Sequence, residues 1–391
     1  MRVLYCALDQ AVPGTKGGAI HVRAVAEGLA ARGHEVHVLT GEGPEGFPAG
    51  PVRWQAMRPP LGRAQLRWLR RADVARVARA LGPDVVMERY YNFGGEGLAA
   101  AREVGALAVL EVNAPIIDYP GSPKARLDRL LLVEPMRRWR DRQCRLADVI
   151  VTPSADILPS WMPRGQVLEV EWGADTERFR PGATGPLPYE RRDTDVVAVF
   201  AGAFRSWHGA QHLVTALQIL QGRGCHAFRA VLIGDGPELP WIRERAAGVE
   251  RVTFTGALPH EAMPAALSGA DIGVAPFDMA AHPPLQLAFY WSPLKIFEYM
   301  AAGLPVVAPR IDRLTRLVAH EREGVLYDPP TPDALATALE SLLDPGRRRR
   351  FGAAARARVV ADFSWAEHCR QLEAAMMKAL ASRAGGAPRE A

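Results

Sequence analysis

Short apolar runs alternate with amphipathic stretches along most of this chain. Near the N-terminus the run RVLYCAL precedes a glycine turn, PGTKGGAIH, then VRAVAEGLAARG with apolar residues at helical spacing, then the alternating run HEVHVLT. This order predicts a strand, a glycine loop, a helix and a second strand. The runs DVVMERY, ALAVLEVN and DVIVTPS follow as further strands. Strands separated by helices predict a parallel sheet covered on both faces.

The same pattern restarts near residue 195. The buried run DVVAVFAGAF and the helical GAQHLVTALQIL come first, and four more strands follow in RAVLIGDGP, RVTFTG, DIGVAPF and LPVVAP. Around residues 176–192 the chain is rich in proline, glycine and charge, as a linker should be. The last periodic stretch, SWAEHCRQLEAAMMKAL, predicts a helix, and SRAGGAPREA a frayed tail.

We therefore predict an α/β protein of two Rossmann-like domains that face one another across a cleft. The predicted N-terminal domain covers residues 1–176 and the C-terminal domain residues 177–362. Residues 363–391 are predicted as a C-terminal helix that returns to the N-terminal domain, with the frayed tail. Ligands of such sheets bind beyond the carboxyl ends of the strands, so the shared cleft is the expected site.

Composition narrows the class of protein. With 48% hydrophobic and 23% charged residues, a mostly disordered chain is excluded. The four cysteines form no CxxC pair, which favours a reducing compartment and argues against a thiolate zinc site. No apolar run approaches the roughly 20 residues that span a bilayer. The start MRVLYCALDQ reaches Asp9 too soon for a signal peptide. We expect a cytoplasmic protein, with peripheral contact at the inner membrane face left open.

Positive charge is concentrated in two segments of the N-terminal half. Residues 53–79 hold eight arginines against one acid, and residues 124–145 hold eight Lys or Arg against three acids. In the first segment, apolar residues at helical spacing predict an amphipathic helix with a basic outer face over 66–81. Two interpretations stay open: a solvated basic surface, or a face for anionic lipid or a polyanionic acceptor. Nucleic acid is not expected, since no aromatic recognition motif accompanies the charge.

The stretch SPLKIFEYMAAGLPVVAP, residues 292–309, carries the main candidate chemistry. Ser292 and Pro293 are typical of a helix start, and Gly303 with Pro305 of a helix end. Lys295 and Glu298 then share one face near a helix N-terminus, which attracts phosphate. We interpret Lys295 as directed toward a diphosphate and Glu298 toward ribose hydroxyls. The alternative is a surface i,i+3 ion pair. Gly17 and Gly18 mark a second helix N-terminus of this kind.

The whole chain resembles a GT-B glycosyltransferase of family four, in a WHG/SPLK variant subgroup. Six stretches match in order across roughly 350 residues. They are GGAIHVRAVAEGLAARGHEVHVLT, VEWGADTERFRP, GAFRSWHG, LIGDGPE, VTFTGALPHEAM and KIFEYMAAGLPVVA. The resemblance implies a retaining transferase with a nucleotide-sugar donor. It implies that Gly18 supplies a loop amide near the donor diphosphate, that Glu298 binds ribose, and that the loop around Leu258 holds the base.

The expected donor site combines the resemblance with the residues themselves. The donor-binding residues are predicted as Gly17, Gly18, Arg205, His208, Asp235, Leu258, Ser292, Pro293, Leu294, Lys295 and Glu298. Of these, Arg205, Lys295 and Glu298 are the predicted catalytic residues. No cofactor is expected and no metal, since the sequence shows no DxD-like metal motif.

Three residues depart from the family pattern. Tyr290 stands where relatives have a glutamate facing the transferred sugar, and Ala203 and His208 stand where they have a diphosphate arginine and lysine. Arg205 and Lys295 are the expected substitutes, because only cations and amides can stabilise a leaving diphosphate in a metal-free site. A non-catalytic sugar-nucleotide-binding partner subunit is therefore one alternative. A GT-B-type nucleotide-sugar epimerase or hydrolase is another.

Polar residues at strand ends of the first half are acceptor-side candidates: Arg89, Tyr90, Glu111 and Asn113. Ordinary strand-end caps and ion pairs are the alternative for these four. The resemblance adds His21, which stands where relatives place a residue lining the acceptor or donor-sugar side; a hydrogen-bonded helix residue is its alternative. The predicted function is transfer of a sugar from a nucleotide-diphosphate sugar to a hydroxyl acceptor, such as a glycolipid, lipid-linked sugar or polysaccharide of the cell envelope. A nicotinamide enzyme is disfavoured, because no GxGxxG follows the first strand and no acid ends the second.

Overall fold

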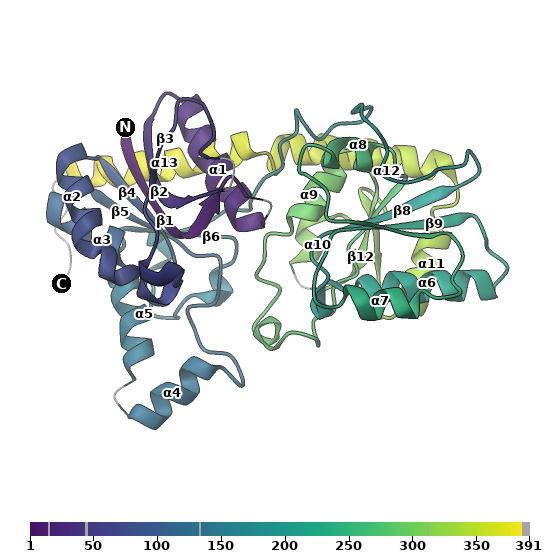
Figure 1. The fold of residues 1–391 in the computed structure, drawn as a ribbon, viewed down its shortest axis with the longest axis horizontal. Coiled ribbons are helices and arrows are strands. Elements are labelled where there is room, and N and C mark those ends of the chain that lie inside the picture. The colour runs from purple at the N-terminus through teal and green to yellow at the C-terminus, as the bar shows by residue number, and fades with distance from the viewer. Residues whose placement is uncertain (15, 44–45, 133, 312, 385–391) are drawn as a thin grey trace. The chain divides into compact units, whose positions relative to one another are not determined.

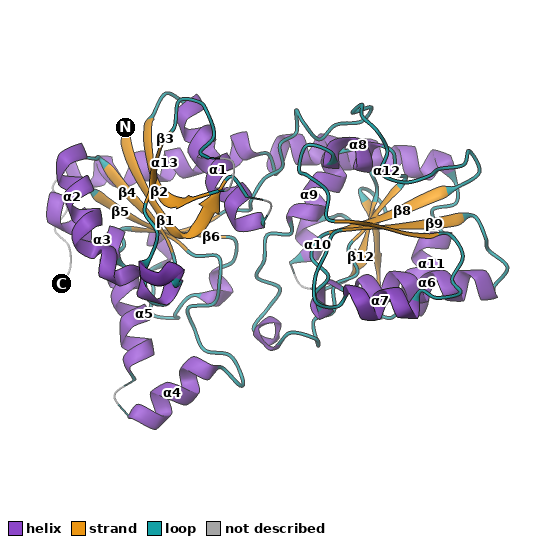
Figure 2. Cartoon of the chain, viewed as in Figure 1, coloured by secondary structure: helices purple, strands orange, loops and turns teal. Residues whose placement is uncertain are grey.

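The protein was analysed as a computed structural model, which describes residues 1–14, 16–43, 46–132, 134–311 and 313–384. The chain forms two compact units. Unit 1 comprises Met1–Trp172, Tyr290–Ser292 and Trp365–Ala391, and unit 2 comprises Gly173–Phe289 and Pro293–Ser364. Each unit contains its own parallel sheet with helices on both faces, which confirms the predicted fold class (Figures 1 and 2).

The sheet of unit 1 has seven parallel strands in the order β3-β2-β1-β4-β5-β6-β7. The strands are β1 (Arg2–Val12), β2 (Glu35–Glu42), β3 (Arg53–Ala56), β4 (Val85–Arg89), β5 (Leu107–Glu111), β6 (Val149–Thr152) and β7 (Val167–Glu169). The central strands are buried on both faces and so read as continuous apolar runs. The edge strands β3 and β7 were not predicted, because they are short and half-exposed and show no such run.

Helices cover both faces of this sheet. Helix α1 (Gly17–Ala31) and helix α13 (Trp365–Ala384) share one hydrophobic core with the strands. Helix α3 (Glu96–Val104) packs on β4 and β5 and touches α2 (Arg71–Leu81) and α5 (Pro135–Leu146). Helix α4 (Pro123–Leu131) contacts α5 and lies away from the strands of its unit (Figure 1). Among the described residues, no helix is both long and apolar enough to cross a bilayer.

The predicted amphipathic helix over 66–81 is wrong in two respects. Residues Ala64–Arg70 form the 3-10 segment η2, and the α-helix α2 begins only at Arg71. The apolar and basic faces are also partly exchanged, since Arg67 is fully buried while Leu69 is 65% exposed. The reason is a set of acidic partners for Arg67, described below, which come from other strands and helices.

The sheet of unit 2 has six parallel strands in the order β10-β9-β8-β11-β12-β13. They are β8 (Val196–Ala201), β9 (Phe228–Ile233), β10 (Val252–Gly256), β11 (Ile272–Val274), β12 (Val306–Pro309) and β13 (Gly324–Tyr327). The first five were predicted, and β13 was not. The helices are α6 (Ala210–Gly222), α7 (Leu239–Arg245), α8 (Met263–Ser268), α9 (Leu294–Ala301), α10 (Leu314–Leu317), α11 (Pro332–Glu340) and α12 (Pro345–Asp362).

The two faces of this second sheet carry different helices. Apolar side chains of α6 and α11 join the strands in one continuous core, and α9 packs against α12. Helix α9 ends as predicted, because Gly303 takes a left-handed φ of 78° just beyond its last turn. The predicted start is wrong. Pro293 rather than Ser292 occupies the N-cap position, and no side chain caps the helix there.

The unit boundaries lie close to the predicted ones, with one exception. The chain passes from unit 1 to unit 2 at 172/173 and returns at 364/365, compared with the predicted 176/177 and 362/363. Residues Tyr290–Ser292 belong to unit 1, although the sequence assigns them to the second domain. Side-chain bonds hold this short segment: the Ser292 hydroxyl donates to Glu171 at 2.8 Å and accepts from Trp172 N at 2.7 Å.

Candidate functional site

Tyr299 fixes helix α9 against the sheet of unit 2. Its hydroxyl accepts a hydrogen bond from Ala201 N at 2.7 Å and donates one to Val274 O at 3.4 Å. These backbone groups lie at the carboxyl ends of β8 and β11. Lys295 stands four residues before Tyr299 and so lies on the same face of the helix. The anchored tyrosine therefore holds Lys295 at the end of β8, where ligands of parallel sheets bind.

Lys295 carries a buried ammonium at the end of a half-buried side chain. Among the described residues, its Nζ has neither an acidic partner nor a hydrogen-bond partner. The ammonium lies 4.1 Å from the centre of the Phe200 ring and 5.3 Å from that of Phe277, so aromatic faces supply its nearest favourable contacts. Burial lowers the pKa of Lys295 to about 7, although Glu298 acts in the opposite direction. The structure thus excludes the surface ion pair that the sequence also allowed.

A tight loop follows β8 and closes around the same ammonium. Gly202 faces Lys295 so closely that an added Cβ would lie 2.9 Å from Nζ. The loop is held from behind by Gly234–Gly236, because Phe204 N donates to Asp235 O at 2.9 Å. Gly234 has φ 130°, and a Cβ there would meet Gly202 O at 2.0 Å, so this contact requires glycine. Backbone packing therefore determines how closely Lys295 approaches the sheet.

His208 lies in this site as a neutral ring. Its Nδ1 is 2.6 Å from Ala203 O, and because a carbonyl only accepts, the proton is on Nδ1. Burial lowers the pKa of His208 to about 3, and the charge of Lys295 lowers it further. His208 thus cannot replace a lysine as a cation at neutral pH. The second cation of the loop is Arg205, which is exposed and lies 5.7 Å from the centre of the Trp207 ring.

Glu298 is one turn further along α9, as predicted. Burial raises its pKa to about 7, while Lys295 and Arg178 oppose that shift. Among the described residues its carboxylate accepts no hydrogen bond, and the His260 ring lies beside it, with Nε2 4.0 Å from Oε1. The carboxylate therefore has lone pairs available for hydroxyl donors of a ligand. The sequence did not single out His260, Phe200 or Phe277, because in the sequence they look like ordinary residues of a hydrophobic core.

The other predicted donor residues are divided between the units. Asp235 and Leu258 lie in loops after β9 and β10, and Pro293 and Leu294 begin α9, all in unit 2. The exposed Asp235 carboxylate accepts from Gly236 N at 2.7 Å and so stabilises its own loop. Gly17 and Gly18 begin α1 in unit 1 as predicted, and Ser292 also belongs to unit 1. The role of these residues stays a prediction.

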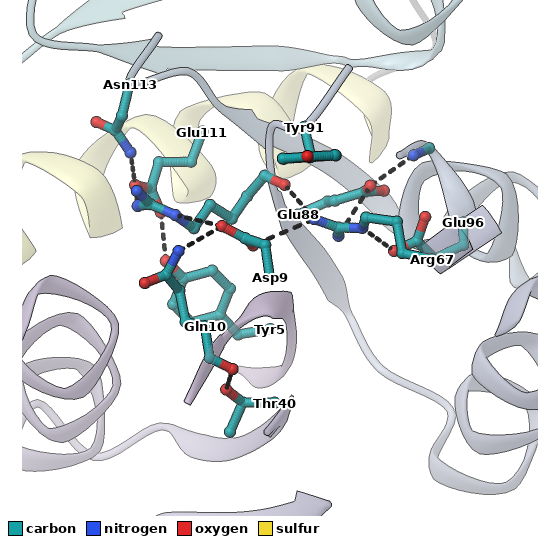
Figure 3. A network of polar contacts seen from close by, with 12 residues as sticks. Tyr5, Asp9, Gln10, Thr40, Arg67, Glu88, Tyr91, Glu96, Glu111 and Asn113 are labelled. Atoms are coloured by element: carbon teal, nitrogen blue, oxygen red, sulfur yellow. Dashed lines mark hydrogen bonds and ion pairs between the residues drawn. The ribbon is translucent and has the colours of Figure 1, made fainter. Parts of the chain in front are cut away.

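Four of the five acceptor-side candidates converge in unit 1. Glu111 is the centre of the group. Its Oε1 is 2.7 Å from His21 Nε2 and accepts from Arg89 at 3.1 Å. Oε1 also accepts from Asn113, and Oε2 accepts from the Tyr5 hydroxyl (Figure 3). Burial alone would raise the pKa of Glu111, but these partners hold it well below its usual range. Glu111 is thus a buried carboxylate kept ionised by its neighbours.

Trp172 completes this group, and Tyr90 lies apart from it. The Trp172 ring stacks on His21 with centroids 4.4 Å apart, and its Nε1 donates to Asn113 Oδ1 at 2.9 Å. Tyr90 is buried with an unpartnered hydroxyl, and Arg140, Cys144 and Asp118 are the charged and polar groups that affect its ionisation. The strand-end position of Tyr90 therefore does not bring its side chain to the cluster.

A second buried ionic cluster of unit 1 was missed by the sequence analysis. Arg67 bonds to Glu96 at 2.5 Å, to Asp9 at 3.2 Å and to Glu88 at 3.3 Å (Figure 3). Glu88 also accepts from Gly95 N and Leu98 N at the start of α3. Burial and the neighbouring Glu96 raise the pKa of Glu88 to about 8. No local signal marks this cluster, because its members are distant in sequence.

Two family profiles match the chain, one in each half. Residues 15–162 match "Glycosyltransferase Family 4" and residues 195–345 match "Glycosyl transferases group 1". Together they match more than half of the chain. The chain belongs to the GT-B glycosyltransferases. This agrees with the family resemblance of its motifs, whereas the WHG/SPLK subgroup has no counterpart in the matches.

Curated relatives and solved structures agree with this assignment. D-inositol 3-phosphate glycosyltransferase of Corynebacterium glutamicum (strain R) is 30% identical over 56% of this chain and 53% of its own length. A GDP-mannose-dependent α-(1-6)-phosphatidylinositol monomannoside mannosyltransferase of Mycobacterium tuberculosis (strain CDC 1551 / Oshkosh) is 30% identical over 49% of this chain and 51% of its length. The chain thus spans about half the length of these relatives.

Solved structures share the fold over nearly the whole chain. Sucrose-phosphate synthase from Thermosynechococcus elongatus superimposes with a TM-score of 0.73 at 21% identity, covering 97% of this chain and 99% of that one. Anabaena Alr3699/HepE in complex with UDP gives a TM-score of 0.70 at 18% identity, covering 97% and 100%. At these identities the likeness establishes the fold of this glycosyltransferase.

Proposed function

We propose that this glycosyltransferase moves a sugar from a nucleotide-diphosphate sugar to a hydroxyl acceptor with retention of anomeric configuration. The observation that carries the proposal is Lys295. A desolvated ammonium without a hydrogen-bond partner, held at a helix N-terminus beyond the end of β8, lacks only an anion to be satisfied. A diphosphate supplies that anion, and Glu298, one turn along, accepts hydrogen bonds from ribose hydroxyls.

The proposed reaction exchanges one bond at the sugar C1 for another, and the cations stabilise the leaving diphosphate. The bond between the sugar C1 and the diphosphate oxygen breaks, and the acceptor oxygen forms the new bond to C1 on the same face. The acceptor proton passes to the leaving phosphate oxygen, so no dedicated base is needed. Charge grows on the diphosphate as the bond breaks, and Lys295 together with Arg205 stabilises it more strongly than in the ground state. The fixed position of Lys295 keeps the reorganisation cost low.

Neutral His208 has a different role from the lysine of relatives. With the proton on Nδ1, the ring is neutral and does not neutralise phosphate. In unit 1, Arg89, Glu111 and Asn113 at strand ends and His21 on α1 provide polar groups suited to an acceptor. A glycolipid, a lipid-linked sugar or a polysaccharide is the proposed class of acceptor.

The first test is a thermal-shift panel with UDP, GDP, ADP, dTDP and NAD. A ligand at about 100 times its dissociation constant adds roughly 2.7 kcal/mol to stability. We expect one nucleoside diphosphate to stabilise the wild type and to lose that effect in Glu298→Ala. Glu244→Ala, an exposed glutamate on α7 of the same unit, is the matched control. No shift with any diphosphate, or a shift with NAD alone, would overturn the proposal.

Product analysis separates the proposed transfer from its alternatives. A transferase releases nucleoside diphosphate only in step with the appearance of glycosylated acceptor, and NMR of the product reports the anomeric configuration. An epimerase or hydrolase would convert the donor without any acceptor. A non-catalytic partner subunit would bind the donor and leave it unchanged. The support for catalysis here is that the charges of Lys295 and Arg205 both act on His208, so two cations of one site are suited to stabilise a leaving diphosphate.

A further inference from the structure

Helix α4 is built with its apolar side chains facing water. Of its nine residues, Asp128 is the one that is buried. Leu127 is 39% exposed, Leu130 78% and Leu131 46%, and Leu132, directly after the helix, is 86% exposed. A helix that packs on a core shows the opposite arrangement, with leucines inside and carboxylates outside. Exposed leucines that gather on one short segment mark a surface that binds something apolar.

Polar contacts, and not the leucines, hold α4 in place. The Asp128 carboxylate accepts from Met136 N at 2.7 Å and from Arg137 N at 2.9 Å, and so caps the N-terminus of α5. Ser122 caps α4 itself by accepting from Ala125 N at 3.4 Å. Arg140 of α5 bonds to both carboxylate oxygens of Asp118, whose Oδ1 also accepts from the Ser122 hydroxyl. The exposed leucines of α4 are therefore not needed to hold this helix against α5.

The cations beside these leucines have no acidic partners. Arg126 and Arg129 alternate with the leucines along α4 and are exposed, and Arg138 is exposed in the first turn of α5. Among the described residues, none of the three forms an ion pair; the Arg129 Nε donates only to Ala125 O, at 3.3 Å. The nearby acid Glu134 pairs with Arg137 at 3.3 Å. The surface thus presents leucines together with uncompensated positive charge.

We infer that this leucine–arginine face, formed by Arg126, Leu127, Arg129, Leu130, Leu131 and Leu132, docks on the surface of an anionic lipid bilayer. The leucines enter the region between headgroups and acyl chains, and the arginines meet lipid phosphates, as in interfacial helices. Nucleic acid suits the arginines but leaves the leucines exposed. The inference goes beyond the proposed glycosyl transfer and does not depend on it, since it concerns α4 of unit 1, whereas Lys295 and Glu298 lie in unit 2.

The test is vesicle co-sedimentation of the full chain. The vesicles are neutral phosphatidylcholine or phosphatidylcholine with 30% phosphatidylglycerol. We expect binding to the anionic vesicles that weakens as salt rises. Leu130→Gln with Leu132→Gln should weaken it at least tenfold, and Arg126→Gln or Arg129→Gln by about fivefold each. Leu61→Gln with Leu69→Gln is the matched control, since those leucines are 85% and 65% exposed in the other arginine-rich segment.

Each result decides the inference. Binding that survives the α4 double variant, binding that the control variant reduces equally, or no binding to anionic vesicles would overturn it. Light scattering with size-exclusion chromatography tests whether the face instead joins two protein copies: a dimer that the α4 variant dissolves would overturn the bilayer as occupant. The nucleoside-diphosphate thermal shift of the same variants shows whether unit 2 is intact, so failure of docking and failure of the donor site are read separately.

Discussion

Two buried cationic groups of this glycosyltransferase have opposite surroundings. Arg67 in unit 1 is surrounded by the carboxylates of Asp9, Glu88 and Glu96, and all of its polar contacts are internal. Lys295 in unit 2 has aromatic rings beside its ammonium and, within the part of the chain that the structure describes, no hydrogen-bond acceptor. The first charge is neutralised by the fold and needs no ligand. The second is left unneutralised by the fold, which is the signature of a binding site.

The comparison also separates stability from function. Satisfying Arg67 requires acids from β1, β4 and α3, so this cluster ties distant elements of unit 1 together. Leaving Lys295 unsatisfied lowers the stability of the ligand-free protein, and a diphosphate would reverse that effect. If this interpretation is right, removing each cation should change stability in opposite directions.

The largest expected effect is that of Arg67→Met. Removing the guanidinium leaves Glu88 and Glu96 buried without their cation, which should reduce the free energy of unfolding by about 3–5 kcal/mol. Urea denaturation followed by circular dichroism measures this. Arg70→Met, in the same segment but on an exposed pair with Asp73, should leave the midpoint unchanged within error. An Arg67 variant as stable as the Arg70 variant would refute the structural role.

Lys295→Met should act in the opposite direction. The apolar chain of similar length removes the desolvation penalty, so the ligand-free protein should gain about 0.5–2 kcal/mol. The same variant should lose the stabilisation, roughly 2.7 kcal/mol, given by saturating nucleoside diphosphate. Thermal unfolding with and without the ligand measures both. Lys378→Met, an exposed lysine on α13, is the control. If the Lys295→Met variant still bound the diphosphate normally, Lys295 would not be the diphosphate-binding cation and its contrast with Arg67 would fail.

A pH profile gives a third expected outcome. The pKa of Lys295 in the folded protein, about 7, is lower than in the unfolded chain, so between pH 7 and about 10 the unfolded state binds more protons. The contribution of Lys295 to the free energy of unfolding of the ligand-free protein therefore rises with pH across that window, by at most about 1.4 kcal/mol per pH unit. Lys295→Met should flatten this slope. Proton uptake on diphosphate binding at pH 8, measured by calorimetry in two buffers, should accompany it; absence of uptake would contradict the pKa assignment.

The smallest effect is expected for Glu298→Gln. The amide retains the shape of the side chain and one acceptor oxygen, so affinity for the nucleoside diphosphate should fall only about tenfold, on the scale of one charge-assisted hydrogen bond. Isothermal titration measures the dissociation constant. A larger loss than in Lys295→Met would mean that ribose contacts, and not the phosphate charge, dominate donor binding.

The two cations also differ in how well their surroundings could be predicted from the sequence. Lys295 and Glu298 share one short helix, so their spacing was visible in the sequence, although the exact start of that helix was not. Arg67 was interpreted as part of a basic outer face, because its three acids are far away in sequence at positions 9, 88 and 96. His208 gave a third outcome. The structure places it near Lys295, and its neutral state follows from burial and from Ala203 O, which the sequence does not reveal.

What the sequence by itself determined is local and periodic: the strand and helix order, the parallel sheets that such an order implies, the end of α9 at Gly303, and the candidates on that helix. Only the tertiary structure decided which charges are neutralised and where Ser292 bonds. It also decided that the leucines of α4 face outward. The physical reason is that periodicity reports burial averaged along one element, whereas the state of a charge depends on partners supplied by other elements. Arg67 and Lys295 look alike in the sequence and differ only in what the fold places beside them.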